Sequence, residues 1–220
     1  MIRSELANQR VLAIAREGYP FILGSLLATA TLAIFGLYVL ALFFLAVTFF
    51  VCFFFRDPER VIPDEEGAVV SPADGKVVEL SGVQEGDFAA EKMLKISVFM
   101  SLFNVHVNRI PYNGRVSDVI YYPGKFFSAN LDKASRENER NVLSLEIGGG
   151  HKLIVVQVAG LIARRIICKI REGDRLSRGE RFGMICFGSR LDVYLPPDTV
   201  PAVSLGDRVL AGTSILGRLL

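Results

Sequence analysis

The amino-acid sequence predicts a mainly β domain, α+β overall, that carries a helical membrane anchor at its N-terminal end. Two observations lead to this prediction. Residues 22–55 contain no charged side chain, whereas charged residues recur along the rest of the chain. From residue 69 onward, short apolar runs alternate with turns rich in glycine, proline and aspartate, which is the pattern of a β domain. We therefore expect an anchor over residues 1–55 and a globular β domain over residues 56–220.

The predicted anchor is longer than one membrane span. A spanning helix needs about 20 apolar residues, and the uncharged run has 34. Two short helices that fold back at Gly36, or one long tilted helix, both fit this length. Arginines on both flanks of the run are compatible with both ends on the cytosolic side, as a hairpin requires. We therefore expect a cell-membrane protein whose β domain faces the cytoplasm.

Residues 1–18 precede the uncharged run and predict an amphipathic helix that ends at Gly18 and Pro20. Such a helix either lies on the membrane surface or forms a solvated leader. The net charge is only +2, so nothing points to nucleic acid and we expect no such partner. Cys52, Cys168 and Cys186 lack the spacing of a disulfide framework or zinc site, so we expect reduced thiols and no bound metal.

The first part of the β domain contains two candidate polar residues. The segment 69–78 predicts a strand, a tight turn and a second strand, with Asp74 in the turn making an Asx-type hydrogen bond. The segment 95–110 predicts one long strand or a pair of strands. On it, His106 shares a polar face with Asn104 and Asn108. His106 is therefore expected to be either solvated or part of a site.

The middle of the domain predicts a long irregular loop over residues 121–141, which combines aromatic with polar side chains. Long loops of this kind are functional or disordered. Gly148–Gly150 predicts a turn, and His151–Ala159 predicts a strand that is apolar on both faces. No helix follows the glycines, so they do not form a phosphate-binding loop. His151, beside this turn, is expected to be structural or solvated.

The C-terminal third contains a short internal repeat. Gly173-Asp174-Arg175-Leu176 reappears as Gly206-Asp207-Arg208-Val209, and each copy is followed by further glycine turns. Duplicated hairpins of this kind predict two interlocked small sheets, as in the barrel-sandwich hybrid of lipoyl and biotinyl domains. No lysine stands at a hairpin tip where such a domain attaches its cofactor, so the similarity concerns architecture alone.

Between the two repeats, residues 184–195 predict one buried strand that ends at Pro196-Pro197. Gly188 interrupts this strand, and a glycine there marks a bulge or a close approach of backbones. The hydroxyl of Ser189 can reach the carbonyl carbon of the residue before it. A strained backbone and a nearby base would let the serine attack its own peptide bond. Since Gly-Ser is a common dipeptide, this prediction depends on the rest of the chain.

Five short segments of the sequence carry a resemblance to a known family. They are Phe54–Arg60, Ser71–Gly75, Asn104–Arg109, Asn138–Asn141 and Phe187–Ser189. In this order and at this spacing they resemble the short, membrane-anchored form of phosphatidylserine decarboxylase. Each segment is weakly specific alone, but together they are highly specific and cover nearly the whole chain.

The resemblance implies a proenzyme that breaks its own Gly188–Ser189 bond through an ester, giving chains 1–188 and 189–220. Ser189 becomes a pyruvoyl cofactor, whose carbonyl forms a Schiff base with the amine of phosphatidylserine and accepts electrons as carbon dioxide leaves. The product is phosphatidylethanolamine, a step of phospholipid biosynthesis. The implied partners are the phospholipid, the membrane and the two chains of one precursor, and a homodimer is left open.

The resemblance also implies catalytic roles for Ser189, His106 and Asp74. Longer family members carry a second histidine three residues after the position of His106, as part of an Asp-His-Ser set for self-cleavage. Here that position is Arg109, and arginine cannot act as a base at neutral pH. Either His106 serves both cleavage and decarboxylation, or Asp74 and backbone groups suffice for cleavage.

Two other functions compete with this one. The first is a membrane-tethered, non-catalytic β-domain that acts as a binding module. The second is a serine hydrolase acting on lipid through Ser189, His106 and Asp74. The hydrolase lacks the Gly-x-Ser-x-Gly elbow, and the pattern around Ser189 predicts a strand rather than a strand-to-helix turn.

Overall fold

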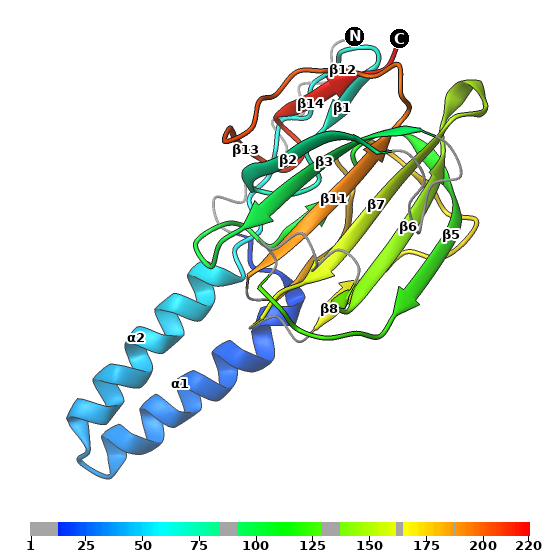
Figure 1. Cartoon of the computed structure of the whole chain (residues 1–220). Helices are drawn as coiled ribbons and strands as arrows, with labels where there is room; N and C mark the ends of the chain where they lie inside the picture. The colour runs from blue at the N-terminus through cyan, green and yellow to red at the C-terminus, as the bar shows by residue number, and fades with distance from the viewer. Residues whose placement is uncertain (1–12, 84–91, 129–136, 162–164, 187) are drawn as a thin grey trace, which may run out of the picture. The chain divides into compact units, whose positions relative to one another are not determined.

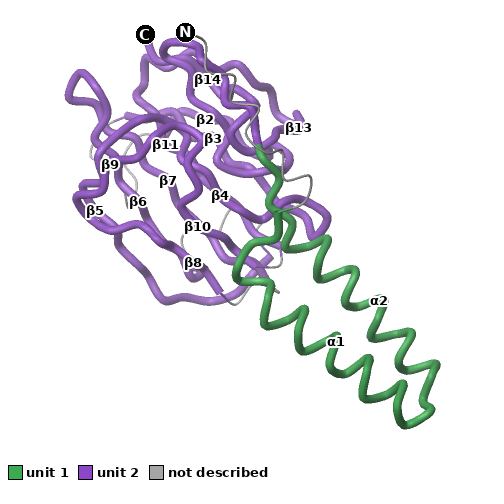
Figure 2. The backbone as a smooth tube through the Cα atoms, turned by 180° about the vertical axis from the view of Figure 1, so that it is seen from behind, with its two compact units in different colours: residues 1–59 green, residues 60–220 purple. Residues whose placement is uncertain are grey.

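The computed structural model describes residues 13–83, 92–128, 137–161, 165–186 and 188–220 (Figure 1). The chain forms two compact units, a helical unit over residues 1–59 and a β unit over residues 60–220 (Figure 2). The predicted fold class, mainly β with N-terminal apolar helices, is confirmed.

The helical unit consists of a 3₁₀ turn, η1 (Arg16–Gly18), and two helices, α1 (Tyr19–Ile34) and α2 (Tyr38–Phe54). The helices run antiparallel, and the chain reverses at Gly36, whose φ of +75° is one that side-chain-bearing residues rarely adopt (Figure 1). A buried hydrogen bond from Thr48 Oγ1 to Ser25 Oγ, 2.9 Å long, joins the two helices. Of the two arrangements that the sequence left open, the structure has the pair of helices.

The start of the helical unit differs from the prediction. Residues 1–12 lie outside the described residues, so the predicted amphipathic helix is untested there. Over residues 13–18 it is wrong, because Ile14 forms an isolated β-bridge with Arg56 and only the 3₁₀ turn follows. Pro20 does not end a helix either. It stands in the first turn of α1, where a missing N–H costs no hydrogen bond.

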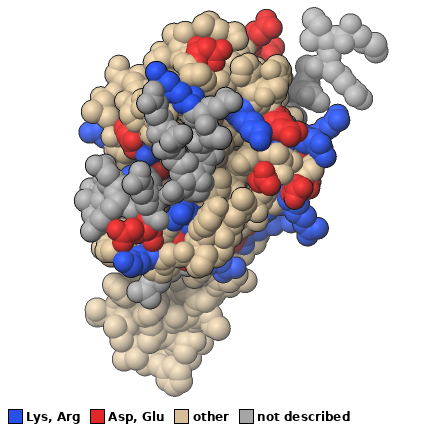
Figure 3. Space-filling model, turned by 45° about the vertical axis from the view of Figure 1, so that its right-hand side comes forward, with Lys and Arg blue, Asp and Glu red and all other residues tan. Residues whose placement is uncertain are grey.

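The surface of the two helices is apolar on all sides. The helical segment Arg16–Ile34 is long and apolar enough to span a membrane, whereas α2 is more apolar but shorter. Neither α1 nor α2 contains a charged residue, and the lower part of the surface in Figure 3 shows no blue or red side chain. Large side chains such as Leu27 and Phe43 are exposed. A helix that is apolar all round is suited to a membrane or a protein core, so these exposed helices indicate membrane association.

The β unit is built on one eight-stranded antiparallel sheet, which is curled in Figure 1. Its strands, in spatial order, are β13 (Arg208–Val209), β2 (Gly75–Val83), β3 (Met93–Met100), β11 (Ser189–Leu195), β7 (Lys152–Ala159), β6 (Arg140–Glu146), β5 (Gly114–Tyr122) and β9 (Arg175–Leu176). Two three-stranded sheets accompany it. One has the order β1 (Ala68–Val70), β14 (Ile215–Arg218), β12 (Val200–Pro201), and the other β4 (Val107–Arg109), β10 (Arg181–Ile185), β8 (Ile166–Cys168). A 3₁₀ turn, η2 (Gly148–Gly150), precedes β7 as predicted.

The two faces of β11 differ in chemistry because successive side chains of a strand point to opposite sides. Leu191, Val193 and Leu195 belong to the main apolar core. Arg190 and Asp192 lie on the other face, fully buried and paired with each other, Nε to Oδ1 at 2.8 Å. Every residue of β11 is therefore buried, and this strand forms the centre of the β unit.

Beside the Arg190–Asp192 pair, Lys95 Nζ lies 2.7 Å from Glu79 Oε2 and 3.8 Å from Asp192 Oδ2. Burial raises the pKa of the Glu79 carboxyl. Hydrogen bonds from Lys95 and Ser97 and the positive charge of Lys95 lower this pKa by more than burial raises it. The pKa of Glu79 therefore lies below its ordinary value of 4.5. Alternating charges thus connect β2, β3 and β11 on this face of the sheet.

The internal repeat seen in the sequence is confirmed as a structural repeat. The N–H of Gly206 donates to Val77 O at 2.8 Å, and that of Gly173 donates to Val116 O at 2.9 Å. The two Gly-Asp turns thereby hold β13 and β9 at the two edges of the large sheet. The repeat also includes a pair of segments that the sequence analysis did not match, Pro72–Val77 and Pro111–Val116, both of the form Pro-x-(Asp/Asn)-Gly-(Lys/Arg)-Val.

The structure decides one open alternative and corrects two predictions. Of the two arrangements expected for the segment 95–110, the structure has the pair of strands, β3 and β4, which lie in different sheets and are separated by a turn. Asn104 closes this turn by accepting hydrogen bonds from Ser101, so it does not share a strand face with His106 and Asn108. The irregular segment predicted over 121–141 is shorter, because β5 extends to Tyr122 and β6 begins at Arg140.

The helical unit generates the first prediction. We expect the protein to stay in the membrane fraction at high salt, because salt screens ionic contacts but not the burial of apolar area. A cysteine placed at Ser4, in a chain whose three native cysteines are replaced, should react with an impermeant reagent only from the cytosolic side, because a hairpin returns both ends to one side. Extraction by salt would contradict the anchor, and labelling from the opposite side alone would contradict the hairpin topology.

Candidate active site around Ser189

The chain crosses from one sheet to another at the Gly188–Ser189 bond. β10 pairs with β4 and β8, whereas β11 pairs with β3 and β7. The prediction of one strand over residues 184–195 is therefore wrong, since β10 ends at Ile185 and β11 begins at Ser189. Phe187 lies outside the described residues. Gly188 has a φ of +64°, in the left-handed region that favours glycine, which explains why the strand breaks here.

Ser189 is the first residue of β11 and is fully buried, as its place in a strand predicted. It lies opposite Met100 of β3 and Ala159 of β7. Its Oγ has no hydrogen-bond partner among the described residues. Leaving a buried hydroxyl unpaired costs about 1–3 kcal/mol, and such a group in a folded protein calls for an explanation, which is often catalytic. Ser189 is therefore the strongest candidate for chemistry in the β unit.

His106 is fully buried, so the solvated position is excluded. It immediately precedes β4, in which Val107 pairs with Met184 of β10. His106 and Ile185 are the next residues at that end of the antiparallel ladder. The histidine therefore stands where the chain leaves β10 for Gly188 and Ser189.

A chain of buried polar side chains connects the two sheets beside this crossing. Asn141 Nδ2 donates to Gln157 Oε1 at 3.1 Å, and Gln157 Nε2 donates to Asn108 Oδ1 at 2.8 Å. Asn108 Nδ2 in turn donates to Met100 Sδ at 3.8 Å. Since Met100 lies opposite Ser189, this chain fixes the layer in which the serine sits. Sequence reasoning did not find Gln157, although a lone glutamine in an otherwise apolar strand is a usable signal.

Asn138 holds a second segment against the same place. Its Nδ2 donates to Ala159 O at 2.7 Å and to Phe127 O at 2.8 Å, and its Oδ1 accepts from the N–H of Phe127 at 2.9 Å. Ala159 is the β7 residue opposite Ser189. The amide of Asn138 thus joins the segment that follows β5 to the strand end beside the serine. Asn138 belongs to the motif Asn138–Asn141, but the motif alone did not indicate its role.

Asp74 lies in a turn, as predicted, and is buried. The predicted Asx-type bond is wrong, because the carboxylate makes long-range contacts. Oδ1 accepts from the N–H of Ala211 at 2.8 Å, and Arg60 Nη2 donates to Oδ2 at 2.8 Å and to Oδ1 at 3.1 Å. Ser71 makes the local turn bond instead, accepting at its Oγ from the N–H of Ala73.

The register of the large sheet places Asp74 relative to Ser189. Lys76 pairs with Phe99 and Ser189 pairs with Met100, so β2 begins at the end of the sheet where β11 begins. β3 lies between them, which separates the two backbones by two strand spacings, about 10 Å. Asp74 is therefore at the Ser189 end of the sheet, with its carboxylate bound by Arg60 and Ala211.

The internal repeat shows which contact of Asp74 belongs to the shared scaffold and which does not. Asn113 is its counterpart in the second copy, and its Oδ1 accepts from the N–H of Arg178 at 2.7 Å, as Asp74 accepts from Ala211. An amide oxygen is thus sufficient for this turn-to-turn bond. Of the two acceptors, only Asp74 is negatively charged, and its charge is paired with Arg60. The charge is therefore not needed for the architecture that the two copies share.

Arg109, at the position of the second family histidine, is held by contacts that stabilise the fold. The side chain is buried, and Nη1 donates to Gly179 O at 2.9 Å. A Cβ on Gly212 would lie 2.9 Å from Arg109 Cδ, so the arginine packs closely against both glycine turns of the repeat. Arg109 therefore joins the two halves of the domain and supplies no base.

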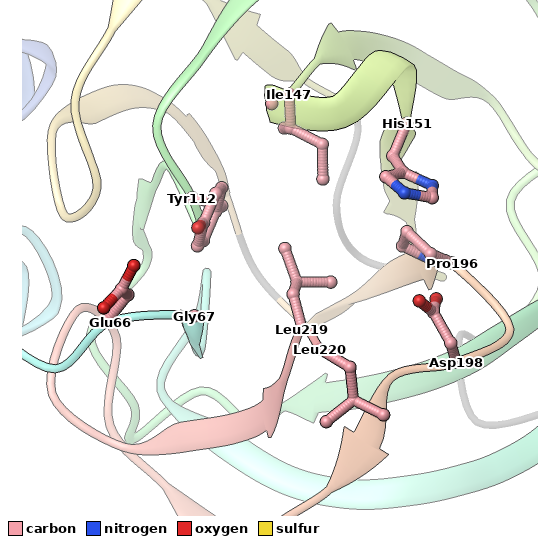
Figure 4. A pocket seen from close by; sticks show the side chains of 10 residues that line it. Glu66, Gly67, Tyr112, Ile147, His151, Pro196, Asp198, Leu219 and Leu220 are labelled. Atoms are coloured by element: carbon pink, nitrogen blue, oxygen red, sulfur yellow. The ribbon is translucent and has the colours of Figure 1, made fainter.

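A cavity of about 210 Å³ lies elsewhere, beyond the other end of β11 (Figure 4). Its lining includes Glu66, Tyr112, His151, Pro196 and Asp198. Pro196 follows the last residue of β11, about 20 Å along the strand from Ser189. None of the three predicted site residues lines this cavity, and His151 is exposed beside it, in agreement with a solvated residue. Across the described residues, no cluster of three or more His, Cys, Asp or Glu side chains is arranged to hold a metal ion.

The chain is similar to known proteins over nearly its whole length. The family model described as phosphatidylserine decarboxylase matches residues 47–217. The chain belongs to the phosphatidylserine decarboxylase family. It is 55% identical over 206 residues to a phosphatidylserine decarboxylase proenzyme of Geotalea uraniireducens, covering 94% of this chain and 96% of that one. It is 54% identical to the proenzyme of Geobacter metallireducens and 50% identical to that of Nitratidesulfovibrio vulgaris, covering 94% of this chain and at least 95% of each relative. The family resemblance of the sequence motifs is confirmed.

The Asp74 site yields a stability prediction. Asp74→Ala leaves the buried N–H of Ala211 unpaired, so we expect it to lower the free energy of unfolding by about 1–3 kcal/mol. Asp74→Asn keeps an acceptor there, as Asn113 does, and should retain most of that stability. Urea titration of the detergent-solubilised chain, in a Ser189→Ala background, measures both.

Asn113→Ala is the matched control, and it should cost less than Asp74→Ala because the N–H of Arg178 is exposed and water replaces the amide. Equal losses for Asp74→Asn and Asp74→Ala would show that the ion pair with Arg60, rather than the shared hydrogen bond, stabilises the turn.

Proposed function

We propose that this chain is a phosphatidylserine decarboxylase proenzyme. In this proposal, Ser189 cuts its own bond to Gly188 and becomes the pyruvoyl group that decarboxylates phosphatidylserine to phosphatidylethanolamine. The observation that carries the proposal is the buried, unpaired Oγ of Ser189 directly after a glycine with φ of +64°. Family membership supplies the reaction class, and this local geometry supports the residue.

Self-cleavage requires two steps at Ser189. The Oγ attacks the carbonyl carbon of Gly188, the C–N bond breaks, and the acyl group of Gly188 passes to the oxygen as an ester. Removal of the α-proton of residue 189 then expels the Gly188 carboxylate. Water adds to the resulting dehydroalanine, ammonia leaves, and a pyruvoyl group remains on chain 189–220. Burial between β3 and β7 keeps the serine beside the bond that it attacks.

The surroundings of Ser189 fit a pyruvoyl group. Residue 189 would remain joined to Arg190, whose strand is held by β3 on one side and β7 on the other. Arg190 and Asp192, paired on the far face, anchor the start of the new small chain. The pyruvoyl group supplies an electron-accepting carbonyl, the part that pyridoxal phosphate takes in other decarboxylases. The buried position of residue 189 excludes bulk water from this carbonyl.

We assign proton transfer to His106 and a supporting role to Asp74. The imidazole is buried at the end of β10 beside the crossing, and histidine titrates near neutral pH. Arg109 is engaged with Gly179 O and stays charged. Of the two alternatives left by the sequence, the structure favours His106 as the base for both reactions, because both oxygens of Asp74 already accept hydrogen bonds. The fixed negative charge of Asp74 then stabilises positive charge that develops at this end of the sheet.

We infer that the apolar helices α1 and α2 anchor the protein in the cell membrane and that the catalytic β unit lies on the cytoplasmic side. Chains 1–188 and 189–220 of one precursor remain together, since β11 is hydrogen-bonded on both sides within the large sheet.

Ser189→Ala tests the cleavage. On a denaturing gel the native protein should separate into chains 1–188 and 189–220, whereas the variant should run as a single chain, because alanine has no nucleophile. Splitting of the Ser189→Ala variant at the same bond would show that another group attacks. An uncut native protein would favour the binding module, or the hydrolase if it releases fatty acid from lipid.

His106→Ala tests the proton-transfer role. Measured on the cleaved fraction, with the pyruvoyl group confirmed by mass, we expect turnover of phosphatidylserine to fall about a hundredfold, the scale of positioned acid–base catalysis. His151→Ala is the matched control and should retain full turnover, because His151 is exposed beside the distant cavity. Full activity of a pyruvoyl-bearing His106→Ala enzyme would remove this residue from the decarboxylation, and loss of cleavage alone would assign it to maturation.

A further inference from the structure

Two loops leave the large sheet on either side of Ser189. Met100 ends β3 and Ala159 ends β7, and both lie directly opposite Ser189 in the register of the sheet. In Figure 1 the arrowheads of β3 and β7 lie at the end of the sheet where β11 begins. The residues that follow these two strands therefore surround the end of the sheet at which Ser189 lies.

The loop after β3 presents an aromatic side chain to the outside. Phe103 is 69% exposed, in the turn between Ser101 and Asn104. Asn104 Oδ1 accepts from the N–H of Ser101 at 2.8 Å and from its Oγ at 2.7 Å, and the N–H of Asn104 donates to Ser101 O at 3.1 Å. These three bonds close the turn on itself. The exposure of Phe103 is thus imposed by a well-bonded turn rather than by a loose segment.

The loop after β7 presents an aliphatic side chain and a cation. Leu161 is 62% exposed two residues beyond Ala159, and Arg165 is exposed where the chain returns to β8. The carbonyl of Arg165 accepts from the N–H of Cys186 at 3.3 Å. Cys186 stands two residues before Gly188, so this loop is tied to the cleavage segment itself.

Single exposed apolar residues are common on protein surfaces and need no explanation. Phe103 and Leu161 differ because each belongs to a loop that adjoins Ser189, on opposite sides of β11. We propose that Phe103, Leu161 and Arg165, here called the apolar rim, form the surface by which the β unit rests on the lipid bilayer. This proposal rests on the proposed function, and it names the surface through which the substrate enters.

The chemistry of the rim fits a bilayer interface. Apolar side chains with a neighbouring arginine insert below the head groups while the guanidinium stays at their level. An anionic lipid such as phosphatidylserine adds attraction to Arg165. A phospholipid whose head group must reach Ser189 keeps its acyl chains in the bilayer, so the end of the sheet at which this residue lies has to face the membrane. A soluble substrate would place no such demand on the loops beside the serine.

The absence of tryptophan from the sequence provides a direct test. In the full-length protein, Phe103→Trp and Leu161→Trp each introduce a single tryptophan. The protein is reconstituted into phosphatidylcholine–phosphatidylglycerol vesicles whose acyl chains are brominated or plain. We expect brominated lipid to quench both tryptophans at least twofold and to leave Val200→Trp, on β12 beyond the other end of β11, nearly unchanged. Val200 is 48% exposed and serves as the matched control.

Equal, weak quenching at all three positions would overturn the proposal. Blue-shifted emission without quenching would overturn it as well, since it would mean that protein, such as a second copy of this chain, covers the rim. Unchanged thermal unfolding of each variant confirms that the substitution at an exposed site leaves the fold intact.

An activity measurement separates this proposal from the proposed function. Phe103→Ser combined with Leu161→Ser should lower turnover of phosphatidylserine in vesicles by roughly tenfold, the scale expected when two apolar side chains lose partial burial. Turnover of a short-chain, monomeric phosphatidylserine and cleavage at Ser189 should not change. Equal loss on both substrates would contradict the docking role. Absence of decarboxylation by the native protein would contradict the proposed function, whereas the quenching result would still stand or fall on its own.

Discussion

The β unit depends on one constraint, the passage of the chain from β10 to β11 between Ile185 and Ser189. The two strands belong to different sheets, so the backbone has to turn within a few residues, and Gly188 does so at a φ of +64°. The turn leaves Ser189 fully buried at the head of the central strand, with its Oγ unpaired among the described residues. His106 precedes the strand that pairs with β10, so it stands at the end of β10 from which the chain leaves for Ser189. The burial of Ser189 and the left-handed glycine before it thus arise from a single feature of the topology.

The duplicated architecture around this crossing shows which contacts belong to the scaffold. Matching turns place β13 and β9 at opposite edges of the large sheet, and Asp74 and Asn113 make matching bonds to backbone N–H groups. Where the two copies make the same contact, the shared fold is sufficient to explain that contact. Where they differ, as at the Arg60–Asp74 ion pair, a role beyond the scaffold is the simpler explanation. The buried amides of Asn108, Gln157 and Asn138 then stabilise the layer around Ser189, because each joins segments far apart in the sequence.

Local patterns in the sequence were sufficient to predict the fold class, the Gly-Asp turns, the apolar helices and the position of Ser189 in a strand. They marked Gly188 as a bulge or a close approach but could not show that β10 ends at Ile185 and β11 begins at Ser189 in another sheet, because apolar content is alike on both sides of the glycine. The burial of His106 also depends on pairing between distant strands, and a period-two pattern does not say which face a partner covers. The ion pair of Asp74 with Arg60 is a long-range contact with no local signature, whereas Gln157 stands out as the one polar residue of the apolar run 153–159 but its partners are distant in the sequence. The repeat of Pro72–Val77 at Pro111–Val116 was present in the sequence and could have indicated the scaffold role of Asp74.

The most direct test of this account is the intact mass of the native protein under denaturing conditions. The account predicts chains 1–188 and 189–220, with the small chain lighter than the unmodified peptide by one ammonia and without a free N-terminal amine. A pyruvoyl group in place of Ser189 gives this mass and no other simple modification of the serine does so at that bond. A single chain of 220 residues, or a small chain that begins with an unmodified serine, would contradict the central claim.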